Sequence, residues 1–223
     1  KQTRAVDKNL FKVASSYRVF SRALCNFSFP DDIQRPMKIH KAMGENPESE
    51  EEEEIDENAF DAVSVNEDTG VESADPDAKY ANEIKTALRK LKENSAEYFS
   101  KEGLQRYSPK MLQILENIED EENVGLHLLY SQFRAVEGIG VFKMVLEENG
   151  FAEFKLVKNA DREWDIQESK PGDEDKPKFV LYTGTESIEE KEIIRHIYNS
   201  NWENLSISLR NKLRAIHENN FMG

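Results

Sequence analysis

The stretch GLHLLYSQFRAVEGIGVFKMVLEENGFAEFKLV, residues 125–157, decides the fold class of this chain. Its apolar run LHLLYS, residues 126–131, is short and continuous, which is typical of a central parallel strand covered on both faces. The segment GVFKMVLEENG, residues 140–150, then predicts a helix that ends at Gly150. FAEFKLV, residues 151–157, predicts a second strand.

The same order repeats further along the chain. KFVLYTG, residues 178–184, predicts a third strand, and SIEEKEIIRHIYN, residues 187–199, predicts the helix that follows it. Strands that alternate with helices indicate an α/β fold with a parallel sheet and right-handed crossovers. The polar residues 159–177 predict an insertion or a hairpin arm. Three strands are few for a sheet covered on both faces, so we expect an incomplete sheet in a fragment of a longer protein.

The net charge of -14 comes from one acidic tract. Residues 45–78 contain fifteen Asp or Glu and no Lys or Arg, so 30 basic residues face 29 acidic ones in the rest of the chain. Such a tract buries too little apolar surface to offset its conformational entropy, and it predicts a solvated, disordered insertion. The alternative role is docking to a basic partner.

Helical patterns lie on both sides of this tract. Residues 7–24 place apolar side chains near one face of a helix, and a proline-containing connector follows. A second amphipathic helix is predicted around residues 80–91, and Ser108 with Pro109 predicts the N-cap and first position of a third. The predicted organisation is a helical connector over residues 1–44, the acidic insertion over 45–78 and the α/β part over 79–223.

The residues that most often carry chemistry form no catalytic or metal-binding pattern. The sequence has no GxxxxGK[ST] phosphate loop, and its four histidines lack metal-ligand spacing. We interpret His127 and Cys25 as core residues of the predicted strand and helix. Trp164 and Trp202 are interpreted as packing anchors that could also stack on a base. Gly138 is interpreted as a residue that relieves crowding at a helix start.

Cysteine content and hydropathy bear on the cellular compartment. One cysteine in 223 residues excludes a disulfide scaffold and suits a reducing compartment. No apolar run approaches the ~20 residues that a membrane-spanning helix needs. We therefore expect a soluble, intracellular protein without a membrane partner.

The combination of LLYSQF, a helix to NGF, a strand and YTGTESIEEKEIIRHIYN resembles the start of the second RecA-like lobe of superfamily-two helicases. It is most similar to the Swi/Snf-type branch, and YSQFR with EGIG looks like the helicase-type ATPases of giant DNA viruses. YRVFSRALCNFSFP also looks like the connector ahead of that lobe. The resemblance covers residues 10–40 and 80–205, and it implies an incomplete parallel RecA-like sheet flanked by helices.

The resemblance also implies a nucleic-acid track. Strand ends in this lobe face the nucleic acid, which would place Ser131, Gln132, Arg134, Thr183 and Gly184 near a phosphate backbone. Hydroxyls, amides and helix N-termini hold phosphates without reading bases. The alternative for the two hydroxyl residues is that they cap helices. The alternative for the arginine is a structural ion pair with Glu137 or Glu147.

The parent protein implied by the resemblance is an ATP-hydrolysing helicase or translocase, possessing ATP and Mg²⁺ sites and active in viral transcription. Its location would be the virion or the host cytoplasmic replication site. Hydrolysis needs a phosphate cradle from one lobe and an arginine from the other. Both lie outside these residues, so we expect the fragment to be inactive, without a cofactor, and to work with the first lobe of its parent.

Two other interpretations remain open. One is a non-enzymatic α/β module that binds nucleic acid or protein, with the acidic tract as its working part. The other is a different α/β enzyme, which would need carboxylate or glycine clusters at the strand ends. The sequence of the flanking chain separates these interpretations from a helicase lobe.

Overall fold

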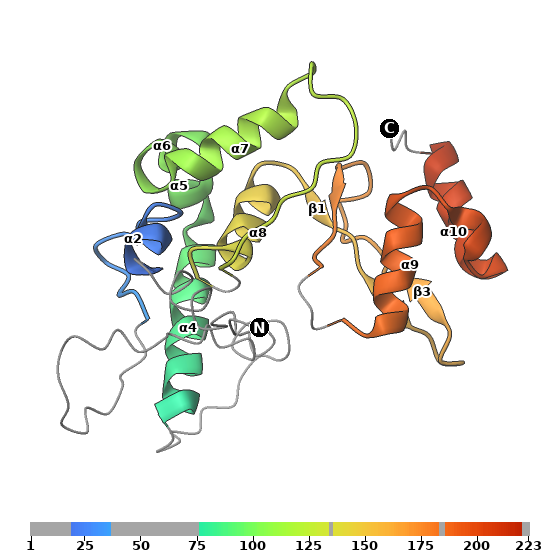
Figure 1. Ribbon diagram of the computed structural model, residues 1–223, viewed down its shortest axis with the longest axis horizontal. Helices are drawn as coiled ribbons and strands as arrows, with labels where there is room; N and C mark the ends of the chain where they lie inside the picture. Colours follow the sequence, from blue (N-terminus) through green and yellow to red (C-terminus); the bar gives the residue numbers. More distant parts are fainter. Residues whose placement is uncertain (1–18, 37–75, 134–135, 183–185, 220–223) are drawn as a thin grey trace, which may run out of the picture. The chain divides into compact units, whose positions relative to one another are not determined.

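The computed structural model of the chain divides into two compact units (Figure 1). The residues that it describes are 19–36, 76–133, 136–182 and 186–219. Unit 1 is built from Lys1–Gln113 and Ser131–Phe142, and unit 2 from Ile114–Tyr130 and Lys143–Gly223. The predicted acidic insertion, 45–78, lies outside the described residues except for its last three, which begin a helix.

The described part of unit 1 is helical. The helices that begin in it are α2 (Val19–Leu24), α4 (Pro76–Glu93), α5 (Ser95–Phe99), α6 (Lys101–Tyr107), α7 (Pro109–Glu119) and α8 (Ile139–Glu148). The predicted helix around residues 80–91 is confirmed, because Ile84, Leu88 and Leu91 lie buried along one face of α4. The predicted helix over residues 140–150 is confirmed as α8. Helices α7 and α8 both end in unit 2.

The end of α2 corrects one prediction. Cys25 directly follows this helix and is exposed, so its interpretation as a core residue is wrong. The buried side chains here are those of Ala23 and Phe27, and the Phe27 ring lies 5.8 Å from that of Phe99. The helix ends before the thiol could join its apolar face. Residues 7–18 of the predicted helix 7–24 lie outside the described residues.

Ser108 is the N-cap of α7, as predicted. Its hydroxyl oxygen accepts a hydrogen bond from the Met111 amide at 3.2 Å, and the same hydroxyl donates to the Asn26 carbonyl. The Ser28 amide donates to the Tyr107 carbonyl at 2.8 Å. The connector after α2 is therefore fixed to the junction between α6 and α7 by one buried side-chain hydrogen bond and one backbone hydrogen bond.

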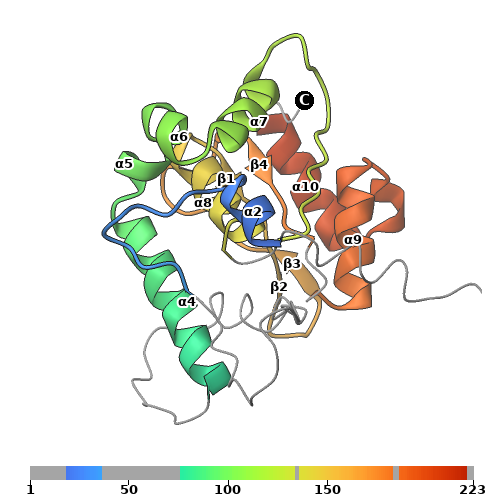
Figure 2. The ribbon, with the colours of Figure 1, turned by 60° about the vertical axis from the view of Figure 1, so that its left-hand side comes forward.

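Unit 2 contains the strands (Figure 2). β1 (Ala152–Glu153) and β4 (Lys178–Phe179) pair in parallel, which confirms the predicted parallel relation between the second and third predicted strands. β2 (Leu156–Lys158) and β3 (Trp164–Ile166) pair antiparallel. The polar residues 159–177 therefore include the turn and second strand of a hairpin arm, which was one of the two alternatives. The chain has mixed helix and strand with a small parallel sheet.

The prediction of a strand over residues 126–131 is wrong. Residues 126–130 form no helix or strand, and Leu128 is 91% exposed. His127 is exposed as well, which corrects its interpretation as a core residue. The physical reason is the sheet: a buried central strand needs neighbours on both edges, whereas β1 and β4 pair in a two-stranded sheet.

The remaining helices of unit 2 pack on the hairpin. They are α9 (Ile188–Tyr198), the 3₁₀ helix η1 (Trp202–Asn204) and α10 (Ile207–Asn219). The predicted helix over 187–199 is confirmed, and Ser187 caps it by accepting from the Glu190 amide at 3.2 Å. Trp164 and Trp202 pack against a buried apolar cluster, so their role as packing anchors is confirmed. That cluster consists of Leu156, Ile194, Leu205, Leu209 and Leu213.

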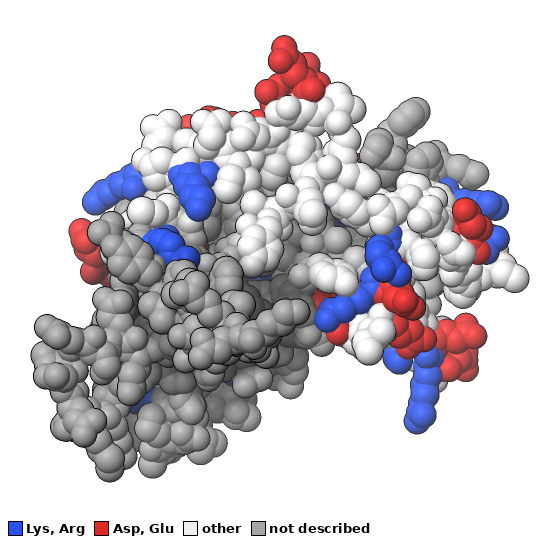
Figure 3. Space-filling model, in the orientation of Figure 1, with Lys and Arg blue, Asp and Glu red and all other residues white. Residues whose placement is uncertain are grey.

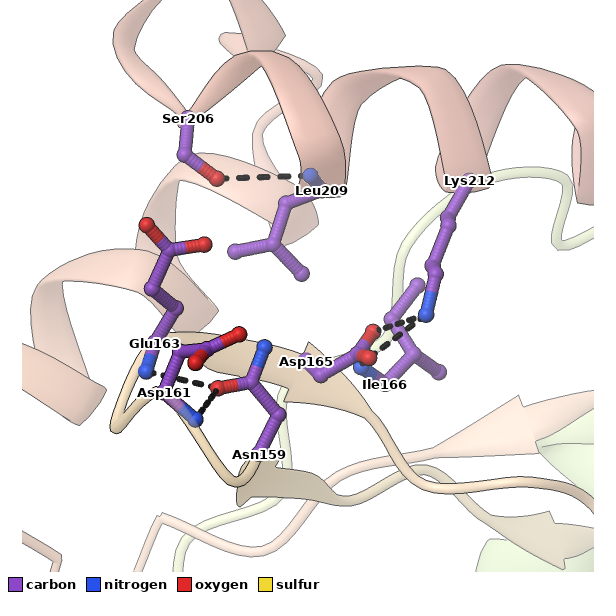
Figure 4. A network of polar contacts seen from close by, with 8 residues as sticks. All are labelled: Asn159, Asp161, Glu163, Asp165, Ile166, Ser206, Leu209 and Lys212. Atoms are coloured by element: carbon purple, nitrogen blue, oxygen red, sulfur yellow. Dashed lines mark hydrogen bonds and ion pairs between the residues drawn. The ribbon is translucent and has the colours of Figure 1, made fainter.

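Polar contacts fix the hairpin and the start of α10 (Figure 4). In the turn, the Asn159 side-chain oxygen accepts from the amides of Asp161 and Glu163 at 3.0 and 2.9 Å. From α10, the Lys212 ammonium reaches both carboxylate oxygens of Asp165 at 2.6 and 2.5 Å. This hydrogen bond, with one from the backbone of Ile166, holds the pKa of the Asp165 carboxyl below its ordinary value.

Replacing Ser108 with Ala should lower the free energy of unfolding by about 2–3 kcal/mol. The substitution removes a helix cap, typically worth about 1 kcal/mol, and leaves the Asn26 carbonyl buried without its hydroxyl donor. Ser100→Ala is the matched control, because Ser100 caps α6 in the same way through the Gly103 amide at 3.2 Å, and its loss should cost only about 1 kcal/mol. Urea melts measure both. Equal losses would contradict the role given to the second hydrogen bond.

Lys212→Met should raise the pKa of Asp165 toward its ordinary value, followed by NMR titration of the carboxyl. A lowered carboxyl pKa contributes stability above the unfolded-state pKa, and this contribution is lost as the pH falls through the folded-state pKa. The variant should therefore be less stable than the parent at neutral pH and equal to it in strong acid. Arg214→Met removes the same charge from the exposed side of α10 and should leave the Asp165 titration unchanged.

Candidate nucleic-acid interface

Gln132 is held by an arginine from a distant part of unit 1. The Arg22 guanidinium, on α2, donates from Nη1 to the Gln132 side-chain oxygen at 2.9 Å, across 110 positions of sequence. Gln132 is exposed and Arg22 is half-buried. The amide oxygen of Gln132 accepts from the arginine, and its amide nitrogen is a hydrogen-bond donor. Two side chains that carry N–H donors thus lie together at the surface of unit 1.

Ser131 has a local structural role. Its hydroxyl oxygen accepts a hydrogen bond from the amide of Phe133, two positions further along the chain, at 3.1 Å. This is the side-chain-to-backbone contact of a serine turn. The next helix, α8, begins only at Ile139, so Ser131 does not cap it. The alternative of a helix cap is therefore wrong for Ser131, and its hydroxyl hydrogen can still donate to a ligand.

The loop between Gln132 and α8 is closed on itself. The Ile139 amide donates to the Phe133 carbonyl at 3.1 Å. A Cβ atom on Gly138 would lie 1.9 Å from the same carbonyl oxygen, so only glycine fits there. The interpretation of Gly138 as a residue that relieves crowding at a helix start is confirmed. The side chain of Phe133 is buried.

A buried ion pair anchors this loop to the connector after α2. Glu137 pairs with the guanidinium of Arg35, and its side chain is only 2% exposed. Glu137 has a φ of 54°, a left-handed conformation that is uncommon for a residue with a side chain. A buried charge is costly unless it is paired, so the ion pair fixes where the loop lies. Glu137 was also a predicted partner of Arg134, which lies outside the described residues, so that alternative stays a prediction.

Arg134, Thr183 and Gly184 lie outside the described residues. Of the predicted set, the structure therefore places Ser131 and Gln132 together at one turn of unit 1. Sequence reasoning missed Arg22 and Arg35. The local pattern around either arginine gives no signal of a partner more than 100 residues away.

The described residues contain no group of three or more His, Cys, Asp or Glu positioned to hold a metal ion. No helix among them is long and apolar enough to cross a bilayer. Comparisons with known protein families, with curated proteins and with solved structures find no match to this chain. The chemistry of the site therefore has to be argued from its own side chains.

Gly138→Ala should destabilise unit 1 by about 1–3 kcal/mol, the usual range for overpacking a close-packed site. The added methyl group would collide with the Phe133 carbonyl and open the hydrogen bond to Ile139. Hydrogen exchange of the Ile139 amide and a thermal melt measure the two effects. A variant that melts with the parent and keeps this amide protected would show that the loop is not tightly closed.

Proposed function

We propose that this chain is part of an ATP-dependent nucleic-acid helicase or translocase, in which it supplies backbone contacts of the second RecA-like motor lobe. The support is the sequence resemblance together with one geometric observation. Arg22 and Gln132, from segments 110 positions apart, are joined at an exposed turn that directly follows the run LHLLYS. Ser131 lies in the same turn.

The chemistry of this turn suits a phosphate backbone. Guanidinium, amide and hydroxyl groups donate hydrogen bonds to phosphate oxygens, and such contacts position a strand without reading its sequence. The closed loop and the Arg35–Glu137 pair hold the turn in place before any ligand arrives. Less ordering is then needed on binding, which improves affinity.

The motor chemistry is proposed for the parent protein and not for this chain. The sequence contains no GxxxxGK[ST] loop to hold a triphosphate. ATP and Mg²⁺ would bind with the first lobe of the parent, which is the protein partner that this proposal requires. A role in viral transcription follows only if the parent belongs to the giant-virus group that the sequence resembles.

Arg22→Ala should weaken binding to labelled single-stranded DNA and RNA about 10-fold, because a hydrogen bond from a charged group contributes roughly 1.5 kcal/mol or more. The slope of log K against log salt should also become shallower by about 0.7, the value for one lost phosphate contact on a single strand. Fluorescence anisotropy over a series of salt concentrations measures both. Gln132→Ala should weaken binding by a smaller factor and leave the slope unchanged, because it removes a neutral donor.

Arg89→Ala is the matched control for this experiment. Arg89 is an exposed arginine of unit 1 that pairs with Glu93 on α4, so its replacement removes the same charge away from the turn. Circular dichroism and a melt of each variant check that the fold is intact. If Arg22→Ala and Arg89→Ala bind alike, or if the parent chain binds neither nucleic acid, the proposed track is wrong and the binding-module interpretation is favoured.

A further inference from the structure

Three segments of unit 1 that hydrogen bonds bring together carry no acidic residue. They are residues 19–30, 103–113 and 131–136, and none of their positions is Asp or Glu. In the whole chain 44 of 223 residues are acidic, so these segments depart from the composition around them. An anion that approaches the chain is opposed least where its carboxylates are missing, because charges beyond about 8–10 Å are screened at physiological salt.

Side-chain hydrogen bonds join the three segments into one surface. Arg22, on α2, donates to Gln132 at 2.9 Å. Asn26, which follows α2, accepts on its side-chain oxygen from the Lys110 ammonium of α7 at 2.7 Å. The end of α2 is therefore tied to the Gln132 turn through one residue and to the start of α7 through another.

Arg22 and Asn26 lie on the same side of the chain. The Phe27 amide donates to the Ala23 carbonyl at 3.1 Å, which continues the helical turn past the end of α2. Positions four apart on such a turn are about 5–6 Å apart at their Cβ atoms. The guanidinium of Arg22 and the ammonium of Lys110, which Asn26 holds, therefore follow one another along this surface.

Two further cations at the junction between α6 and α7 have N–H groups to spare. Arg106 and Lys110 are both exposed, and neither forms an ion pair with a carboxylate of the described residues. The Arg106 guanidinium lies over the Tyr107 ring, 5.2 Å from its centroid. An ammonium has three donors, of which Lys110 uses one on Asn26. In Figure 3, Lys and Arg side chains gather over α2 and α6, and most of the surface between them is uncharged.

We propose that Arg106 and Lys110 are further phosphate contacts of the nucleic-acid track. A single strand then runs from the Gln132 turn across the end of α2 to the junction between α6 and α7. This inference rests on the proposed function, because it extends the same track. Lys110 contributes a point charge, and Arg106 contributes a planar guanidinium held over an aromatic ring.

The Arg106–Tyr107 pair favours a nucleic acid over an acidic protein segment. Bases stack on aromatic rings and on guanidinium planes, whereas a peptide carboxylate uses only the charge. The same region also limits the path. The Tyr107 ring lies 5.4 Å from that of Tyr98, whose hydroxyl donates to the Asp32 carboxylate at 3.1 Å. A phosphate would be repelled by Asp32, so we expect the path to end at Tyr107.

Fluorescence anisotropy of the full chain with labelled single-stranded DNA, over a series of salt concentrations, tests this path. Lys110→Ala and Arg106→Ala should each weaken binding about 10-fold, as expected for one hydrogen bond from a charged group. Each should also make the slope of log K against log salt shallower by about 0.7. The double variant Arg22→Ala/Lys110→Ala should make it shallower by about 1.4, because two separate phosphates lose their partners.

Two variants separate charge from structure. Lys90→Ala is the matched control, because Lys90 is an exposed lysine of α4 that no carboxylate of the described residues pairs with; it should leave affinity and slope unchanged. Lys110→Gln keeps a donor for Asn26 but removes the charge, so it should bind like Lys110→Ala. A Lys110→Gln variant that binds like the natural chain would show that Lys110 only holds Asn26, and would overturn its role as a phosphate contact.

The outcomes distinguish this inference from the proposed function. If Arg22→Ala has its expected effect while Lys110→Ala and Arg106→Ala bind like Lys90→Ala, the track stops at the Gln132 turn; the extended path is then wrong and the proposed function stands. If the natural chain does not bind the oligonucleotide, both are wrong. A polyglutamate peptide that displaces an oligonucleotide of equal charge at equal concentration would identify an acidic protein segment as the ligand, and would also overturn the extended path.

Discussion

A strand that is buried in a parallel sheet must have hydrogen-bonding neighbours along both edges, and this requirement governs unit 2. The parallel pair β1–β4 has only two residues in each strand, and β2 and β3 pair with each other in a separate sheet. The apolar run at 126–130 is left outside both sheets. The unit is instead stabilised by the packing of α9, η1 and α10 on the hairpin around the cluster that contains Leu209 and Leu213.

Several polar contacts of unit 1 join residues that are distant in sequence. In the connector after α2, the Asn26 carbonyl accepts a hydrogen bond from the Ser108 hydroxyl. Arg35, in the same connector, pairs with the buried Glu137. The same α2 region supplies Arg22 to Gln132. A short connector thus fixes both the start of α7 and the loop before α8. Because the Ser108 hydroxyl and the Glu137 carboxylate are buried, losing either of their contacts costs more than losing an exposed hydrogen bond such as that between Arg22 and Gln132.

The candidate site and the exposed segment are neighbours in sequence but depend on different physics. Ser131 and Gln132 lie in a turn whose position is set by hydrogen bonds and an ion pair. Leu128 and Tyr130, just before them, are exposed and belong to neither sheet of the described residues. In the proposed function, the polar donors of the first feature contact a phosphate backbone.

The sequence by itself determined those features whose cause is local. Ser108 before Pro109 specifies a capped helix, the apolar spacing in α4 specifies its buried face, and the polar run at 159–177 allows a hairpin. Gly138 could be interpreted in the sequence because crowding at a helix start is also a local effect. The parallel relation of β1 and β4 was predicted from an alternation of strand and helix, but the segment that connects them contains the β2–β3 hairpin and no helix.

Only the tertiary structure decided the contacts that join distant segments. Nothing near Arg22 or Arg35 in the sequence indicates Gln132 or Glu137 as a partner, because such pairs depend on how the chain folds over more than 100 residues. The run LHLLYS has the composition of a buried strand, yet burial depends on which strands lie beside it. Composition sets what a segment can bury, and the neighbours that the fold provides decide whether it is buried.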